Sequence, residues 1–282
     1  MDNIFLGCDS ANIEKCSSVF ARMLRRLPDY VEAVGIGGSY AAGTADKDSD
    51  IDIFILVKDE QISDAIHNFP AFAATIDEIL LQKGATWIER YGYVFSFLFT
   101  NIGNCQFMVN DSGTLDNSPP RGRTRIIYDS TGFFTGFTKK MVNSTWDYSS
   151  IFGQAVNKFW LRVLSTVRAI RRGQLWLAHS YLTDLRHQSF IVERLLHKSD
   201  PIDYRAPEKC IEEDIGDLIS MEYRLTCPSY NSEELIIGLT SMIKRFCYIS
   251  HQVSKQHNYP YQTKGECVVL GIVKNMLNIF ID

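Results

Sequence analysis

The sequence lacks the cysteine patterns that stabilise small secreted domains or bind structural zinc. Seven cysteines are present, an odd number, and neither a C-x-x-C pair nor a Cys/His cluster at zinc spacing occurs. Free thiols buried in a reducing compartment are the simplest interpretation. The chain also lacks a cationic, signal-peptide-like start, and its longest apolar runs, such as residues 53–57, are too short to span a bilayer. We therefore expect a cytoplasmic protein that does not act at a membrane.

An excess of positive charge is also missing. Lys and Arg number 29 against 33 Asp and Glu, which gives a formal net charge of −4. No large basic field is available to hold a long nucleic acid non-specifically, so the composition disfavours a polynucleotide partner. Hydrophobic residues make up 45% of the 282 residues, which is ordinary for a globular protein with a core. That length permits one large or two modest domains.

The first half of the chain alternates helix and strand patterns. Apolar residues at helical spacing predict helices, and short β-branched or aromatic runs predict strands. The predicted helices are residues 12–27 and 62–81, the second with a break or restart at Pro70. The predicted strands are Val31–Ile36, Ile51–Val57 and residues 93–99, 106–109 and 126–129. The polar, proline-containing residues 111–125 are expected to form a loop.

The second half has a different character. Strand signals fade from about residue 150, and four helices are predicted at residues 152–172, 175–196, 207–225 and 233–256. Ser232 is a suitable N-cap for the last of them. An α/β half followed by an all-helical half predicts an α+β protein with two domains, residues 1–145 and 146–282.

Residues that suit a phosphate site follow the first predicted strand. Gly37, Gly38 and Ser39 end that strand. Glycine lets the backbone approach a phosphate closely, and the Ser39 hydroxyl and nearby N–H groups can donate to its oxygens. A lone Gly-Ser pair is usually only a turn.

Two carboxylates introduce the next strand. Asp50 and Asp52 are separated by one residue, so on a strand they face the same way. Adjacent carboxylates are costly unless a cation neutralises them, and hard oxygen ligands suit Mg²⁺, which also binds triphosphate oxygens. A solvated strand edge is the ordinary alternative for such a pair. Here the apolar residues 53–57 follow directly, and the combination with Gly38-Ser39 favours a functional site.

The order Gly38-Ser39, loop, Asp50-Ile51-Asp52 resembles the signature of the DNA polymerase β nucleotidyltransferase superfamily. The resemblance implies an N-terminal nucleotidyltransferase fold, a mixed sheet flanked by helices, followed by a helical-bundle domain. It implies that Gly38 and Ser39 hold the β and γ phosphates and that Asp50 and Asp52 bind the metal. The implied reaction moves a nucleoside monophosphate onto a hydroxyl, and pyrophosphate leaves.

The helical half is similar, more loosely, to bacterial aminoglycoside nucleotidyltransferases of the streptomycin 6-adenylyltransferase group. The similarity rests on the segment from Asn157 to Trp160 and on the arginine-rich stretch around residues 168–174. Arg168 falls where that group has a lysine suited to a triphosphate; its alternative is a solvated cation on an amphipathic helix. The resemblance makes residues 146–282 an acceptor-binding domain, with Lys158 on the acceptor side.

Two positions depart from the family pattern. A third carboxylate is expected on a later strand, and the corresponding residue is Gln106, whose amide offers a carbonyl oxygen but cannot act as a general base. Asp111 is a substitute only if the strand register differs from the expected one. The streptomycin-type enzymes carry a glutamate at the position of Lys158, and a lysine there repels a cationic aminoglycoside.

Three hypotheses follow from the sequence. The first is a Mg²⁺-dependent enzyme that transfers a nucleoside monophosphate, AMP from ATP, to a hydroxyl of a small molecule, with an aminoglycoside-like acceptor favoured. The second is transfer to a protein or to a tRNA end, of which the acidic charge balance disfavours only the tRNA. The third is a nucleotide-binding protein that has lost catalysis at Gln106. The donor NTP, the acceptor and the oligomeric state are left open by the sequence.

Overall fold

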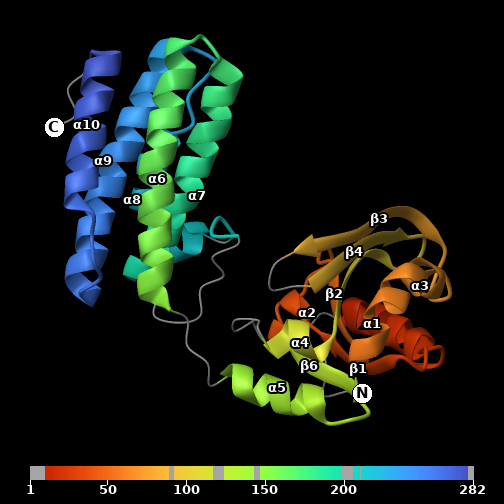
Figure 1. The fold of residues 1–282 in the computed structure, drawn as a ribbon. Coiled ribbons are helices and arrows are strands. Elements are labelled where there is room, and N and C mark those ends of the chain that lie inside the picture. The colour runs from red at the N-terminus through yellow and green to blue at the C-terminus, as the bar shows by residue number, and fades with distance from the viewer. Residues whose placement is uncertain are drawn as a thin grey trace. The chain divides into compact units, whose positions relative to one another are not determined.

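The computed structural model describes residues 10–88, 92–116, 124–142, 147–197, 206–209 and 211–278. The chain divides into two compact units, residues 1–146 and 147–282 (Figure 1). The first unit combines a sheet with helices, and the described part of the second contains helices alone. The predicted α+β class is therefore confirmed. The predicted boundary between residues 145 and 146 falls outside the described residues.

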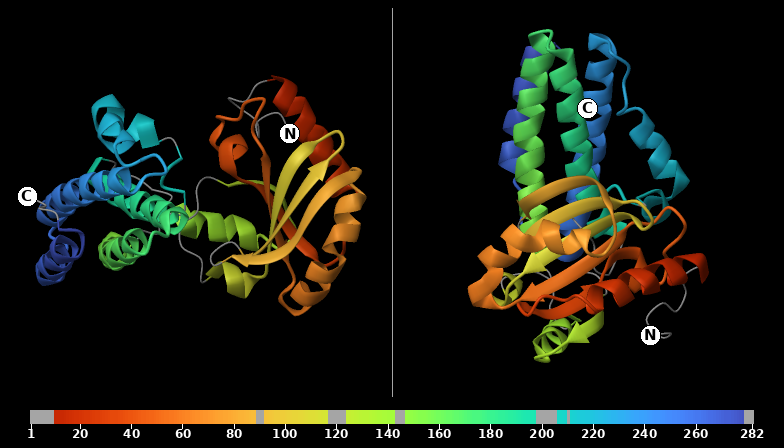
Figure 2. Two further views of the ribbon diagram at one scale, coloured as in Figure 1. Left: turned by 90° about the horizontal axis from the view of Figure 1, so that it is seen from above. Right: turned by 90° about the vertical axis from the view of Figure 1, so that its right-hand side faces the viewer.

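The first unit is built on a six-stranded sheet with the order β3-β4-β5-β2-β1-β6. β2 and β5 pair in parallel, and the other neighbouring pairs are antiparallel. Figure 2 shows the curved strands β3 and β4 at one edge of this sheet. The strands are β1 (Val31–Ile36), β2 (Ile51–Val57), β3 (Ile79–Ile88), β4 (Gly92–Phe99), β5 (Gly103–Asn110) and β6 (Arg125–Asp129).

Helices cover both faces of the sheet. Their bounds are α1 (Ser10–Leu24), α2 (Gly38–Ala42), α3 (Ile62–Ala74), α4 (Ser112–Asp116) and α5 (Phe133–Val142), and the 3₁₀ turn η2 spans Asp59–Gln61. The main core includes Phe20 and Met23 of α1 and Phe69 of α3. The smaller core, on the opposite face, includes Leu115 of α4 and Phe134 of α5.

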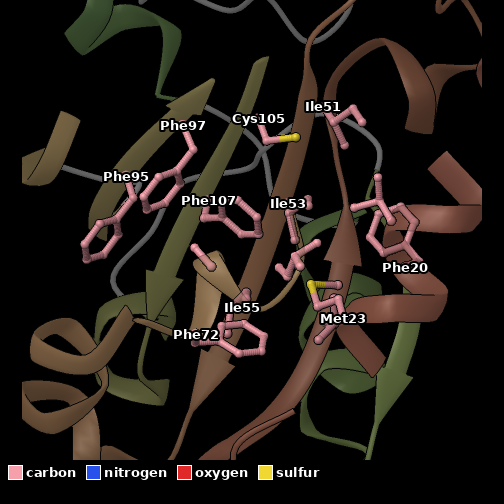
Figure 3. Packing of buried hydrophobic residues seen from close by; sticks show 14 of the residues in the cluster. Phe20, Met23, Ile51, Ile53, Ile55, Phe72, Phe95, Phe97, Cys105 and Phe107 are labelled. Carbon is pink, nitrogen blue, oxygen red and sulfur yellow. The ribbon is translucent and has the colours of Figure 1, made fainter. Parts of the chain in front are cut away.

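Residues of β2 alternate between these two cores. Ile51, Ile53 and Ile55 belong to the main core, whereas Phe54 and Leu56 belong to the smaller one. This alternation is the period of two expected of a strand buried on both faces. Figure 3 shows the main core, in which side chains from α1, β2, α3, β4 and β5 meet: Phe20, Met23, Ile51, Ile53, Ile55, Phe72, Phe95, Phe97, Cys105 and Phe107.

The predicted helix at residues 62–81 is wrong in its second part. α3 ends at Ala74, and Ile79–Ile88 forms strand β3. The N–H groups of Thr75 and Ile76 close a turn on the carbonyls of Phe72 and Ala73, each at 2.9 Å, and the chain then gains a ladder with β4. Sheet pairing therefore overrides the local helical pattern.

The predicted break at Pro70 is also wrong, because Pro70 lies inside α3. A proline in a helix interior costs about 3 kcal/mol. Phe69 and Phe72 of the same helix are buried in the main core. Burying two aromatic side chains offsets that cost, at about 1.5–3 kcal/mol for each.

Several helices escaped the sequence prediction. α4 begins inside the expected loop at residues 111–125, where Asp111 accepts a hydrogen bond from the Thr114 N–H at 2.7 Å, and residues 117–123 of that loop lie outside the described part. α2 begins in the Gly37–Ser39 segment that was predicted only to end the strand, and α5 was not predicted. Asn231, rather than the expected Ser232, caps α9, since its side chain accepts from the Glu233 N–H at 2.7 Å.

The second unit is a helical bundle. Figures 1 and 2 show α6, α7, α9 and α10 running side by side. Its helices are α6 (Tyr148–Arg171), α7 (Leu175–His197), α8 (Ile211–Arg224), α9 (Ser232–His257) and α10 (Thr263–Leu277), of which α10 was not predicted. The rings of Phe159 and Phe246 stack between α6 and α9 with centroids 3.5 Å apart. In the described part of the chain, no helix has the length and apolar character to cross a membrane.

A buried ion pair joins three helices of this bundle. The Glu193 side chain is fully buried and accepts hydrogen bonds from Arg245 Nε at 2.6 Å and Nη2 at 3.0 Å. It also accepts from the Tyr223 hydroxyl at 2.9 Å. Burial and the Glu193 carboxylate raise the pKa of Tyr223 well above its ordinary value, so Tyr223 stays a donor. The network holds α7, α8 and α9 together.

Phe107→Ala is expected to lower the free energy of unfolding of the first unit by about 3–5 kcal/mol, because it leaves a cavity among packed rings. Phe107 is fully buried, and its ring centroid lies 5.2 Å from that of Phe69. Urea denaturation followed by circular dichroism measures the change. Leu81→Ala, at a side chain with 67% exposure, is the control and should shift stability by at most about 0.5 kcal/mol. Equal urea midpoints for the two variants would contradict this account of the core.

Arg245→Met is expected to destabilise the second unit by about 3–5 kcal/mol, because it leaves the Glu193 carboxylate buried without its partner. Thermal unfolding of the whole chain measures the loss. Arg224→Met removes an exposed arginine from the last turn of α8 and serves as the charge-matched control. If both variants melt with the wild type, the ion pair contributes nothing to the bundle.

Candidate active site

The glycine-serine segment joins β1 to α2 and lies against β2. The Gly37 N–H donates to the Asp52 carbonyl at 2.9 Å, which ties the segment to the strand that carries the carboxylates. A Cβ on Gly37 would overlap with the Phe54 ring. Glycine at this position therefore lets the turn approach β2 directly above the smaller core.

Gly38 takes a conformation that favours glycine. Its φ is +57°, in the left-handed region, and a Cβ at this position would overlap with Asp52 Oδ2. Both features exclude a larger residue. Ser39 follows in α2 with a half-exposed side chain, and its hydroxyl makes no hydrogen bond within the part of the chain that the structure describes. The hydroxyl is therefore available to a ligand beside Asp52.

A hydrogen-bonded turn at residues 46–49 precedes Asp50 and Asp52, which lie at the start of β2. Asp46 Oδ1 accepts from the Asp48 N–H at 3.0 Å and from the Ser49 hydroxyl at 2.9 Å. These hydrogen bonds, the Ser49 hydroxyl first, lower the pKa of Asp46. Asp50 precedes β2 and Asp52 is its second residue; both are half-buried and belong to the face of the sheet that Phe54 continues.

Gln106 completes this group of side chains. It is the register partner of Asp52 in the parallel β2–β5 pair. Its Nε2 donates to Asp50 Oδ2 at 3.2 Å. The structure thus brings Gly38, Ser39, Asp50, Asp52 and Gln106 together, from three segments that are far apart in the sequence.

Asp111 lies directly after the C-terminal end of β5. It follows the strand, about 16 Å beyond Gln106 at a rise of about 3.3 Å per residue. Its carboxylate caps α4 through Thr114. The register therefore leaves Gln106, and not Asp111, beside the two aspartates.

The donor set fits a divalent cation that takes part of its shell from elsewhere. Asp50 and Asp52 supply hard oxygen ligands on one face, and Ser39 and the Gly38 backbone lie beside them. In the described ranges, no group of three or more His, Cys, Asp and Glu side chains could hold a metal ion. Two carboxylates leave most of a six-oxygen shell open, so the triphosphate of a nucleotide and water would complete it.

The pairing also reveals a polar row that the sequence prediction missed. Gln106 pairs with Ser96 of β4, and Ser96 pairs with Lys83 of β3. Register partners share a face, so the row Asp52-Gln106-Ser96-Lys83 crosses the sheet with strands about 4.8 Å apart. The predicted helix at residues 62–81 covered only the start of β3, and residues 82–88 were not predicted as a strand, so Lys83 was not assigned to this group. The next row on the same face, two residues further along β2 and β5, consists of Phe54, Met108 and Val94, which belong to the smaller core.

Arg125 is a further cation near the turn. It pairs with Ile36, the last residue of β1, and its Nε donates to the Ala41 carbonyl at 2.8 Å. The guanidinium therefore fixes the C-terminal end of the short helix that contains Ser39. No sequence pattern marked Arg125, because its place depends on the β1–β6 pairing.

Lys158 and Arg168 lie on α6 of the second unit, about 15 Å apart along the helix axis. Both are exposed, and Arg168 is in the last turn of the helix. Lys158 lines a groove of about 450 Å³ together with Arg162, Asp184 and His187. Arg162 is paired with Asp184 at 3.0 Å. Lys158 and Arg168 thus belong to the second unit, whereas the group around Asp52 belongs to the first.

Residues 16–90 match the family model of the nucleotidyltransferase domain. The match contains Gly38, Ser39, Asp50 and Asp52, whereas Gln106 lies beyond it. The first unit is therefore similar to a nucleotidyltransferase domain over these residues, and the expected fold, a mixed sheet with helices followed by a helical region, is confirmed. A search of curated proteins finds no match to this chain.

Two solved structures are similar over most of the chain. An aminoglycoside 6-adenyltransferase from Bacillus subtilis is 12% identical, with a TM-score of 0.39, and the alignment covers 93% of this chain and 97% of that one. A nucleotidyltransferase-like protein from Exiguobacterium sibiricum 255-15 is 11% identical, with a TM-score of 0.38 and coverages of 94% and 88%. Values this low do not transfer a substrate to this chain.

Gly38→Ala is expected to weaken binding of a magnesium–nucleotide complex at least about tenfold while leaving the fold intact. The new Cβ overlaps with Asp52 Oδ2, and a left-handed alanine costs about 1–2 kcal/mol. Isothermal titration with a non-transferable ATP analogue measures the affinity, and circular dichroism checks the fold. Gly84→Ala on β3 is the control, because no atom lies within 4 Å of its added Cβ. Unchanged affinity in Gly38→Ala would remove this turn from the nucleotide site.

Proposed function

We propose that this protein is a divalent-metal-dependent nucleotidyltransferase that moves a nucleoside monophosphate, AMP from ATP, to a hydroxyl of a small molecule. The observation that carries the proposal is the convergence of Asp50 and Asp52 with the glycine-serine turn on one face of the sheet. A match to the nucleotidyltransferase domain across these residues supports it. Proteins of this family generally use an NTP and a divalent metal ion.

Each residue of the site has a role in this proposal. Gly38 and Ser39 bind the β and γ phosphates through the close backbone approach and the free hydroxyl. Asp50 and Asp52 hold Mg²⁺, which when bound neutralises charge that builds up on the triphosphate. Together they orient the α-phosphorus so that the acceptor hydroxyl attacks in line, forming a P–O bond while the bond to pyrophosphate breaks.

The proton of the acceptor hydroxyl must leave to a group other than Gln106. An amide is not a base at neutral pH. Phosphoryl-type transfer depends chiefly on positioning and electrostatic stabilisation, so a weak base lowers the rate without abolishing it. Transfer is therefore chemically possible although Gln106 cannot act as a general base.

The helical unit is proposed to bind the acceptor, and an aminoglycoside-like compound is the first acceptor to test. The groove beside Lys158 gives the unit a place of suitable size. Arg168 is proposed to reach the triphosphate. Lys158 would repel a polycation, so an acceptor with fewer positive charges than streptomycin fits this groove better.

A second candidate is a protein that binds NTP without transferring it, and Gln106 at the expected third carboxylate is the observation that favours it. The two candidates share the nucleotide site and differ in turnover. A transfer assay therefore separates them, whereas a binding assay does not.

Asp52→Asn is expected to lower transfer at least about 100-fold, because it removes one of two metal-binding carboxylates, equivalent to about 2.7 kcal/mol of transition-state stabilisation. Transfer of label from each α-labelled NTP to a panel of aminoglycosides and other hydroxyl compounds, with Mg²⁺, measures the activity. Asp48→Asn, an exposed aspartate in the preceding turn, is the charge-matched control and should keep it. Absence of transfer to any acceptor, with nucleotide still bound, would favour the non-catalytic candidate.

A further inference from the structure

The third ligand position of this site is occupied by an amide that already has a partner. Gln106 lies in register with Asp52, and its Nε2 donates to Asp50 Oδ2 at 3.2 Å. An amide that faces a carboxylate must present its NH₂ group, since the carbonyl oxygen would repel the carboxylate. One N–H of Gln106 therefore points to Asp50 Oδ2, the oxygen that a cation between Asp50 and Gln106 would need.

The charge of the site also argues against a second cation beside Gln106. The protein side of the site contributes two negative charges, those of Asp50 and Asp52. A third carboxylate would supply the charge and the oxygen for a second ion, and Gln106 supplies neither while it donates to Asp50. The described residues include no group of three or more acidic, His or Cys side chains that could make up the difference.

We infer that the site holds a single divalent cation, which enters together with the nucleotide, and that the Gln106 amide stands where a second ion would bind. The inference rests on the proposed nucleotide site. Two carboxylates alone are a weak chelator for a six-coordinate ion, and triphosphate oxygens raise the ligand count. Gln106 acts as a positioning residue: its N–H holds Asp50 Oδ2, so that the other carboxylate oxygen faces the ion.

The test counts Mn²⁺, which replaces Mg²⁺ as a paramagnetic probe. Free Mn²⁺ is measured by electron paramagnetic resonance during titration of the whole chain, with and without α,β-methylene ATP, which cannot be cleaved at the reacting bond. We expect one tightly bound ion per chain with the analogue and at least tenfold weaker binding without it. Two tight ions, or equally tight binding without the analogue, would overturn the inference.

Gln106→Glu tests the role of the amide directly. The added carboxylate should admit a second Mn²⁺ close to the first, which is recognised by spin coupling between the two ions. Gln82→Glu adds the same charge at an exposed position of β3 and should keep a single ion. A single uncoupled ion in a folded Gln106→Glu variant contradicts the inference.

Gln106→Met keeps the length of the side chain and removes the N–H donor. We expect one ion with affinity reduced about three- to tenfold, since Asp50 loses its hydrogen bond; unchanged affinity would refute the positioning role. Failure of the proposed function is recognised separately, because the analogue itself would then not bind in a calorimetric titration. If two ions bind together with the analogue, the nucleotide site is supported, and only the inference of a single cation is wrong.

Discussion

The parallel register of β2 on β5 is the constraint on which the site depends. It sets Asp52 opposite Gln106 and brings the Gln106 amide within reach of Asp50. It also carries Asp111 to the far end of the sheet, where that carboxylate caps a helix. A shift of one residue would turn Gln106 to the other face and Cys105 or Phe107 toward the aspartates. The chemistry of the site is therefore decided by backbone pairing.

The same strand joins the site to the cores of the first unit. Isoleucines on one face of β2 fix it in the main core, and Phe54 on the other face lies beneath Gly37. The carboxylates thus stand on a strand whose position is determined by packing on both sides. Rigid support of this kind limits the reorganisation that charged ligands would otherwise require.

Local patterns were sufficient for the two strands that carry the motif, because Val31–Ile36 and Ile51–Val57 are buried apolar runs with the bounds that the sequence predicted. These two strands, together with the resemblance to the nucleotidyltransferase superfamily, were enough to predict Gly38, Ser39, Asp50 and Asp52 as site residues. Strand β3, however, begins inside the stretch predicted as helix, residues 62–81, and its other residues were not predicted as a strand; β3 forms through pairing with β4. Lys83, Ser96 and Arg125 escaped prediction for this reason, since long-range register places them. Helix α10 also went unpredicted.

The close spacing of Asp50 and Asp52 affects the stability of the folded chain, and with it the resistance of the chain to proteases. Like charges on one half-buried strand end weaken the folded state while no cation is present. A ligand that binds only the folded chain stabilises it by about 2.7 kcal/mol at a hundredfold excess over its dissociation constant. If the chain binds nucleotide and metal as proposed, the population of unfolded molecules open to proteases falls as the concentrations of nucleotide and metal rise.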